Sequence, residues 1–198
     1  MAIVDKPPLI EIRLLDPGDS LAGFSCGTSD LDEWLRDDAV RLQDRGSVAV
    51  YVARSDNKIV GYVSLLSDCI RVNSRERKDL KFSHDDHPSI PAVKIAHLAV
   101  QRELQKKGIG TALLRFASDK AFVVAESVGC RLLTLDAYPE RVSWYESHGF
   151  VRNKQVAKEA ASEWKCPDGC PEHRKVDGER VSMRLDLTGD EIPDWMKD

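Results

Sequence analysis

The sequence of 198 residues lacks long hydrophobic runs: stretches such as Ala121 to Ala125 are far shorter than the roughly 20 residues that cross a membrane. Its first residues also lack a basic segment followed by an apolar one. We therefore expect neither a membrane-spanning nor a secreted protein, and the expected location is cytoplasmic. The five cysteines, an odd number at scattered positions, argue against a disulfide framework.

The chain also lacks an excess of positive charge. Its 29 lysines and arginines stand against 33 acidic residues, for a net charge of −4. No overall field therefore attracts nucleic acid or an anionic membrane, and any contact with a polyanion needs a local patch. The candidates are Arg71, Arg75, Arg77, Lys78 and Lys81, which Arg36, Arg41 and Arg45 could extend.

The length favours a single domain over residues 1–198, because two ordinary domains would need a longer chain. Alternating apolar and β-branched residues predict strands over Glu11 to Leu15, Ser47 to Arg54, Ile59 to Leu66, Ala92 to Val100, Arg131 to Leu135 and Val181 to Leu187. Apolar residues at helical spacing predict helices from about Ser29 to Leu42, from Gly108 to Val128 and from Pro139 to His148. The remainder is a long connection over Ser67 to Pro91, an inserted loop at about 154–180 and an acidic C-terminal tail. Strands that alternate with helices in this way predict an α/β sandwich.

The start of the first helix has a recognisable pattern. Ser29 followed by Asp32, or Asp30 followed by Glu33, is typical of an N-cap residue with a carboxylate three positions later. Such a pair satisfies backbone N–H groups that the first helical turn leaves without partners. We expect the helix to begin at one of these pairs.

Two glycines stand at the junction between a strand and the long helix, in the segment Gln105-Lys106-Lys107-Gly108-Ile109-Gly110-Thr111. Glycines let the backbone approach a ligand closely, and unpaired N–H groups at a helix N-terminus suit phosphate. The segment is neither a P-loop nor a dinucleotide fingerprint. Taken alone, it is also compatible with a tight turn that binds nothing.

A second motif gives this junction a context. Gln105, Gly108 and Gly110 follow Leu98-Ala99-Val100, and Trp144-Tyr145 is followed by Gly149-Phe150. Together these segments resemble the two signatures of the GNAT acetyltransferases. The resemblance implies a GNAT fold: a mixed, mostly antiparallel sheet of six to seven strands with a splayed parallel pair, flanked by helices on both faces.

The resemblance implies acetyl-CoA as cosubstrate, bound between the splayed strands. Its pyrophosphate would lie on the backbone from Lys106 through Lys107, Gly108, Ile109 and Gly110 to Thr111. Its pantetheine arm would bond to the backbone of Leu98, Ala99 and Val100. Many family members have Asn-x-x-Ala before the aromatic pair, where this sequence has Tyr138 and Arg141, so coenzyme contacts from that turn are not implied.

The implied reaction is direct attack of an amine on the thioester. Tyr145 matches the family position that protonates the departing thiol, and a phenol with a pKa near 10 keeps its proton at pH 7. The general base stays open among His97, Glu103, Asp136 and Glu140. Without an obvious base, an α-amine with a pKa of roughly 7.7–8.0 is a better acceptor than a lysine amine near 10.4.

The first half of the chain is similar to a subgroup. Residues Phe24 to Leu35, with Cys26-Gly27 and Leu31-Asp32, resemble the opening of the GNAT toxins of toxin–antitoxin modules. That resemblance implies aminoacyl-tRNA as acceptor and a DNA-binding antitoxin as partner. Two alternatives stay open: an acetyltransferase with another amine acceptor, and a non-catalytic module that binds acyl-CoA or a protein. A homodimer is compatible with the family, but no sequence feature specifies the oligomeric state.

A metal site is the least supported feature. Cys166, Cys170 and His173 could supply three zinc ligands, but no fourth ligand follows nearby. The prolines and glycine between them favour a plain loop. We therefore expect no metal.

Overall fold

The computed structural model describes residues 9–71, 74–82, 89–153, 180–188 and 195, without the side chains of residues 74 and 75. The strands are β1 (Glu11–Leu14), β2 (Ala49–Ser55), β3 (Lys58–Ile70), β4 (Ile90–Val100), β5 (Leu132–Ala137), β6 (Val151–Arg152) and β7 (Val181–Asp186). The α-helices are α1 (Ser29–Asp37), α2 (Ala39–Asp44), α3 (Ser74–Asp79), α4 (Ile109–Val128) and α5 (Val142–Ser147), with short 3-10 turns η1 (Arg102–Leu104) and η2 (Pro139–Arg141). None of the helices in these ranges is long and apolar enough to span a membrane.

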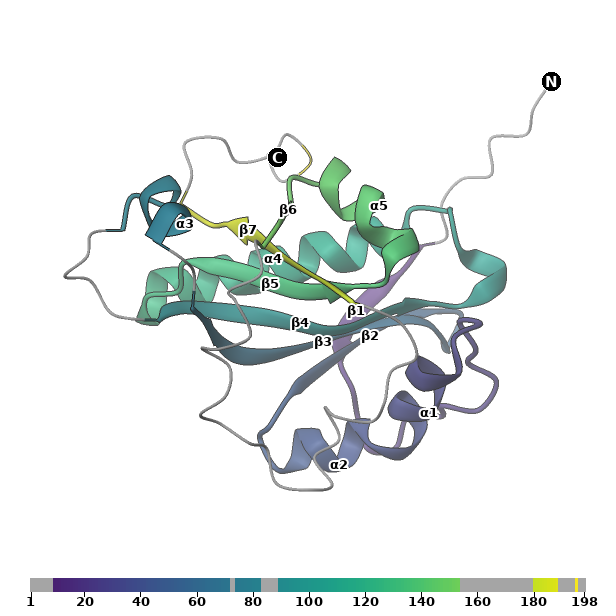
Figure 1. The fold of residues 1–198 in the computed structure, drawn as a ribbon. Coiled ribbons are helices and arrows are strands. Elements are labelled where there is room, and N and C mark those ends of the chain that lie inside the picture. The colour runs from purple at the N-terminus through teal and green to yellow at the C-terminus, as the bar shows by residue number, and fades with distance from the viewer. Residues whose placement is uncertain (1–8, 72–73, 83–88, 154–179, 189–194, 196–198) are drawn as a thin grey trace.

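All seven described strands form one sheet in the order β1-β2-β3-β4-β5-β7-β6 (Figure 1). The pair β4–β5 is parallel, and every other pairing is antiparallel. This mixed, mostly antiparallel sheet confirms the predicted α/β architecture. The parallel pairing runs from Ala92↔Leu132 to Ile95↔Leu135, although both strands continue beyond it. The two strands thus separate over their last residues, as the resemblance implied.

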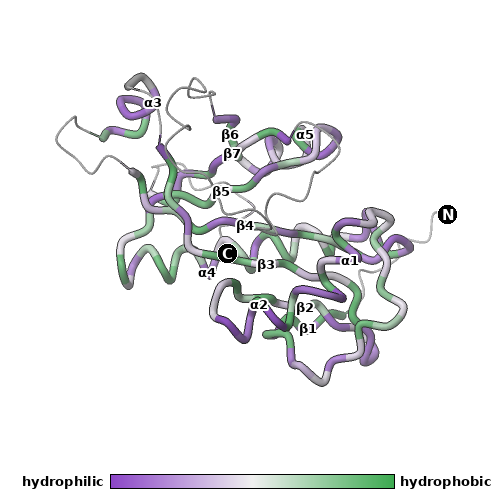
Figure 2. Tube along the Cα trace, turned by 60° about the horizontal axis from the view of Figure 1, so that its bottom comes forward, coloured by the Kyte–Doolittle hydropathy of each residue, from purple (hydrophilic) through white to green (hydrophobic). Residues whose placement is uncertain are grey.

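Helices cover both faces of the sheet, as predicted. On one face, α4 packs its buried residues Leu113, Leu114 and Ala117 against the central strands. Gly61 on β3 permits this contact, since a Cβ there would lie 3.0 Å from a Leu113 methyl carbon. On the other face, α1 and α2 cover the second cluster of buried residues. Figure 2 shows the same division, with apolar segments inside and the charged helix α3 outside.

A β-bulge in β4 decides which face its side chains occupy. Ser64 pairs with His97 and the next residue of β3 pairs with Ile95, so Ala96 is an extra residue on β4. Before the bulge, Ile95 packs on the α4 face. After it, Ala99 packs on the α1 face. The bulge also follows the last residue of β4 that pairs with β5, so the strands separate where the ladder is interrupted.

Three local predictions were wrong. The first helix begins after Thr28, which makes no side-chain cap, and Asp32 instead accepts hydrogen bonds from the Cys26 N–H and the Ser25 hydroxyl, both at 2.8 Å. The helix is also interrupted at Asp38, which lies between α1 and α2. β3 extends to Ile70 rather than ending at Leu66, because its polar second half pairs with the start of β4.

The connection between β3 and β4 contains α3, which an ion pair fastens to the sheet. The Arg184 guanidinium on β7 donates to the Glu76 carboxylate at 2.9 Å, and their side chains are 9% and 1% exposed. Arg184 also donates to the Asn153 side chain at 2.6 Å. Next to this pair, Arg131 bonds the Leu80 carbonyl oxygen at 3.1 Å. α3 is therefore held by charges that its polar sequence does not reveal.

Candidate active site

A cavity of about 230 Å³ opens where β4 and β5 separate. One end is formed by the strand-to-helix junction before α4, and the other by residues after β5 and before β7. Its lining includes the predicted cofactor residues Leu98, Ala99, Val100, Gln105, Lys106, Gly108, Gly110 and Thr111, and also Tyr145. The structure thus brings both sequence motifs to one cavity.

The junction before α4 presents backbone donors. Gly108 is the N-cap with φ +86°, and Lys106 also has a positive φ of +62°. The first helical bond runs from the Ala112 N–H to the Gly108 carbonyl, so the N–H groups of the three residues before Ala112 lack partners within the helix. A Cβ on Gly108 would meet no atom within 4 Å. This end of the cavity therefore offers free donors at an open surface.

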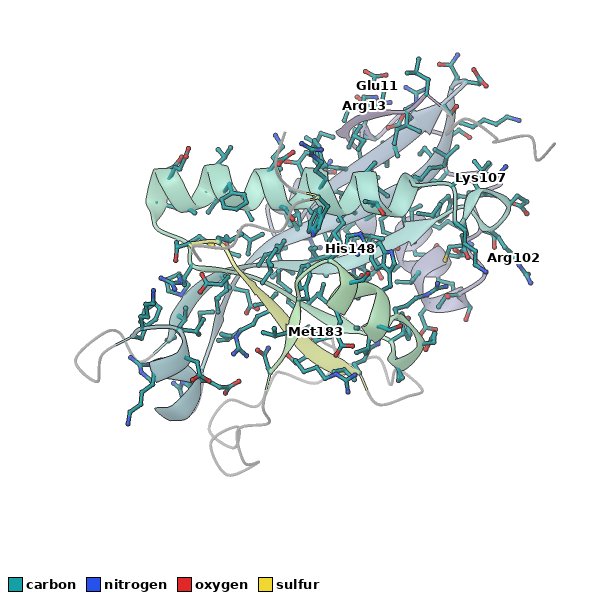
Figure 3. All side chains as sticks on the ribbon, turned by 90° about the horizontal axis from the view of Figure 1, so that it is seen from above. Glu11, Arg13, Arg102, Lys107, His148 and Met183 are labelled. Atoms are coloured by element: carbon teal, nitrogen blue, oxygen red, sulfur yellow. The ribbon has the colours of Figure 1, made fainter. Side chains whose placement is uncertain are left out.

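The other predicted cofactor residues divide into three kinds. Gln105 anchors the loop, because its amide donates to the Cys26 carbonyl at 2.8 Å and to the Val100 carbonyl at 3.1 Å. The Ile109 side chain is buried in the core, so only its backbone is placed to contact a ligand. Lys107 is not among the lining residues and lies near the start of α4 (Figure 3).

Tyr145 is buried beside the cavity, at 8% exposed. Its ring packs against Phe150 at 5.6 Å and Trp144 at 4.8 Å between centroids. Burial raises its pKa to about 12, although the positive charges of Arg141 and Arg180 oppose the shift. The hydroxyl therefore holds its proton throughout the physiological range, as a proton donor must.

His97 lies in the same cavity but is not a strong base. Its ring stacks on Trp34 at 3.8 Å between centroids, and its Nδ1 lies 2.9 Å from the Ser64 hydroxyl. Burial lowers its pKa to about 3, and the nearby cations Arg180 and Lys94 add to the effect. The imidazole is thus neutral at pH 7 and too weakly basic to take a proton from an ammonium group.

The three acidic residues considered as general bases differ in their position relative to the cavity. Asp136 and Glu140 line the cavity, whereas Glu103 does not. Asp136 forms an ion pair with Lys94 at 2.9 Å. Glu103 accepts a hydrogen bond from the Gln101 amide at 2.9 Å. These contacts do not single out a general base.

The model of the GNAT acetyltransferase domain matches residues 46–152, which is more than half of the chain. The chain belongs to the GNAT acetyltransferase family. This match includes the splayed strands, the α4 junction and Tyr145. A GNAT domain therefore accounts for both motifs and for the cavity that joins them.

The relatives of this GNAT chain include toxins. A tRNA-acetylating toxin of Mycobacterium tuberculosis is 27% identical over 139 residues, which cover 69% of this chain and 80% of the toxin. The solved structure of AtaT complexed with acetyl-methionyl-tRNAfMet has a TM-score of 0.68 and 24% identity, over 74% of this chain and 89% of that one. AtaTR bound with AcCoA gives a TM-score of 0.65 and 22% identity, over 90% and 93%. The two structures show that the GNAT fold is shared.

Two residues at the far end of the GNAT cavity were missed by sequence analysis. Tyr138 follows β5 and was noted only as a departure from the family pattern, and Arg180 precedes β7 at the end of the expected insertion. Both line the cavity, and the Arg180 guanidinium carbon lies 3.6 Å from the Tyr138 ring centroid. The pairing of Ala137 with Val181 brings them together. That strand pairing spans 44 residues, so no local pattern reveals it.

The basic residues proposed as one patch form two groups. Figures 1 and 2 place α3 well apart from α1 and α2, so Arg36, Arg41 and Arg45 do not extend the group around α3. Arg41 is also paired with Asp38. On α3, the carboxylate of Glu76 is buried against Arg184, so it does not face solvent beside Lys78.

The candidate zinc ligands lie outside the described residues. Cys166, Cys170 and His173 fall in the segment 154–179, so the structure gives no test of that site. Within the described ranges, no group of three or more histidine, cysteine or acidic side chains is placed to hold a metal ion.

Proposed function

We propose that this GNAT acetyltransferase transfers the acetyl group of acetyl-CoA to the α-amino group of aminoacyl-tRNA. The observation that supports it best is the single cavity that joins the free N–H groups before α4 to the Tyr145 side chain. Acetyl-CoA requires this arrangement, because its pyrophosphate would lie at the junction before α4 while its thioester lies near Tyr145. We treat residues 1–198 as one domain that performs this reaction.

The cofactor end fits the proposed cosubstrate on three counts. The α4 N-terminus supplies donors and the positive end of a helix dipole for the pyrophosphate. Gly108 leaves open the space that a side chain would occupy. From His97 to Val100, β4 pairs with β3 only, so its other edge is available to the amides of a pantetheine arm. Bound there, acetyl-CoA supplies an activated acyl group.

The reaction needs two proton transfers, one to the leaving sulfur and one from the attacking amine. As the acceptor nitrogen forms its bond to the acyl carbon, the carbon–sulfur bond breaks and Tyr145 donates its proton to the leaving sulfur. The proton lost by the amine passes to water, from which Tyr145 recovers a proton, since His97 is a weak base and Asp136 is paired with Lys94. The acceptor must therefore arrive neutral, which favours an α-amine over a lysine.

This proton balance predicts the pH dependence. Tyr145, with its pKa raised to about 12, stays protonated below that value, so we expect no falling limb up to pH 9. His97, with its pKa lowered to about 3, is neutral over the same range and adds no inflection near 6.5. We expect kcat/KM for an α-amine acceptor to rise about tenfold per pH unit and to level off near pH 8, where the amine becomes neutral.

The measurement is initial-rate acetylation between pH 5.5 and 9 with the wild type and with His97→Gln. Because the inflection belongs to the acceptor, it should stay in place in the variant even if the rate changes. An inflection near 6.5 that His97→Gln removes would instead make this histidine the base.

The acceptor is inferred from the relatives together with the charge distribution. The M. tuberculosis relative is a tRNA-acetylating toxin, and AtaT was captured with acetyl-methionyl-tRNAfMet. Because this chain has a net charge of −4, RNA contact must use local groups such as Lys78 and Lys81 near α3. An acceptor of this kind implies a cytoplasmic site of action and an antitoxin partner, as AtaT binds the antitoxin AtaR.

The deciding experiment is acetylation of aminoacyl-tRNA with labelled acetyl-CoA at increasing salt. We expect labelled aminoacyl-tRNA, with kcat/KM falling as salt rises, since each neutralised phosphate adds about −0.7 to −0.9 to the log–log slope. A free amino acid and a lysine peptide serve as control acceptors. No labelled aminoacyl-tRNA would contradict this acceptor, and coenzyme binding without thiol release for any amine would favour the non-catalytic module.

A further inference from the structure

Arg180 and Tyr138 form a stacked pair at the end of the cavity away from the α4 junction. They flank the antiparallel pair Ala137↔Val181, so the sheet itself sets their separation. The guanidinium also lies close enough to lower the pKa values of both His97 and Tyr145 through its charge. The pair is therefore next to the place where the acceptor amine must react.

The polar groups of this pair are not satisfied by the described part of the protein. The Arg180 Nε and the Tyr138 hydroxyl are both buried without a partner of good hydrogen-bond geometry there, although the hydroxyl lies near enough to Arg180 for the contact to oppose the rise of its pKa. Burial raises the pKa of Tyr138, although Arg180 opposes the shift, so the phenol keeps its proton. Buried polar groups without partners cost free energy, which a ligand that engages them would recover.

Arg180 also differs from the five described arginines for which an ion pair with an acidic side chain is found. Such ion pairs are formed by Arg13, Arg41, Arg131, Arg152 and Arg184. No described carboxylate forms an ion pair with Arg180, even though Asp136 and Glu140 line the same cavity. Asp136 is paired with Lys94, and His97 beside it is neutral. The charge of Arg180 is thus not neutralised by a direct ion pair, although the carboxylate of Asp30 acts on Tyr138 from nearby.

We propose that Arg180 and Tyr138 form an anion clamp that binds the phosphodiester adjoining the aminoacyl ester of the acceptor. The inference rests on the proposed function and deepens it, because it names what the enzyme recognises beside the amine. A guanidinium offers several N–H donors in a planar fork that matches phosphate oxygens, and the tyrosine ring holds that fork in one plane. A free amino acid could place only its carboxylate there, so the acceptor assay must separate these two anions.

The test compares matched acceptors that differ by one phosphate: an aminoacyl ester of adenosine, with and without a 5′-phosphate. For the wild type we expect kcat/KM to be about 10- to 100-fold higher with the phosphate, as for hydrogen bonds to a charged group. Arg180→Met should reduce this preference to near one, because the preference is a ratio that a change in the rate with both esters leaves unaffected. Arg180→Lys, which keeps the charge but not the fork, should retain only part of it.

Two controls separate recognition from general damage. Arg152→Met removes the same charge from an exposed pair with Glu146 and should leave the preference unchanged. Tyr138→Phe keeps the ring under the guanidinium and tests the hydroxyl alone. A wild-type enzyme that acetylates both esters equally, or an Arg180→Met variant that keeps the preference, would overturn the clamp and leave the proposed function intact. A preference for the free amino acid would assign the clamp to a carboxylate, and failure with every aminoacyl ester would contradict the proposed function itself.

Discussion

Replacing Tyr145 with phenylalanine is expected to lower kcat by about 10²- to 10⁴-fold, the usual contribution of a positioned proton donor. The ring contacts with Trp144 and Phe150 do not involve the hydroxyl, so the fold and the coenzyme affinity should be retained. Without the phenol, the sulfur must leave as an unprotonated thiolate in a buried, poorly solvated place, which is costly.

The measurements are thiol release from acetyl-CoA and calorimetric titration with CoA. Tyr51→Phe is a matched control, since Tyr51 packs on Phe116 and does not line the cavity. In cells, growth arrest on expression of the wild type should be lost with Tyr145→Phe and kept with the control. A variant at position 145 that binds CoA normally and still turns over at the wild-type rate would show that the proton comes from elsewhere.

The second large effect concerns stability. Glu76→Gln leaves the Arg184 guanidinium buried without its counter-charge, and breaking a buried pair in this way costs about 3–5 kcal/mol of unfolding free energy. For a chain of this size, that corresponds to a fall in Tm of about 6–20 °C. The Asn153 oxygen at 2.6 Å from Arg184 can replace only part of the interaction.

Urea unfolding of three variants and one control variant tests the stabilising effect of the buried ion pair. Glu76→Gln and Arg184→Met should each be strongly destabilised, whereas the double variant should lose less than the sum of the two, because no unpaired charge is left. Glu146→Gln breaks the exposed pair with Arg152 and should cost about 0–1 kcal/mol. Equal, small losses for the buried and exposed pairs would mean that α3 is not held by this contact.

The sequence was most informative where a structural feature depends on neighbouring residues. The helical spacing from Gly108 to Val128 predicted α4, and alternation over Ser47 to Arg54 predicted the strand that is β2. The glycines of the α4 junction indicated a phosphate site because their backbone properties are local. A motif of adjacent residues predicted Tyr145 as the proton donor, and the structure places it beside the cavity.

Sequence analysis missed features that depend on contacts between residues far apart in the chain. Ala96 and its neighbours do not reveal the bulge, which exists only because β3 pairs with β4 in that register. The polar end of β3 was predicted as part of a connection, because only its pairing with Ile90 to Lys94 makes it a strand. Similarly, the contact between Glu76 and Arg184 joins residues 108 positions apart, and nothing in either segment indicates the other.

The extra residue at Ala96 has a consequence for how this gene can change. Removing that one alanine would restore a regular ladder in which His97 still opposes Ser64, so the later residues of the strand would keep their present faces. An in-frame deletion of the Ala96 codon would thus straighten the strand beside the cavity without exchanging its two faces. Deleting the Leu98 codon would instead shift the register by one, turning Ala99 toward α4 and Val100 toward α1. A single-codon deletion should therefore be tolerated better at position 96 than two positions later.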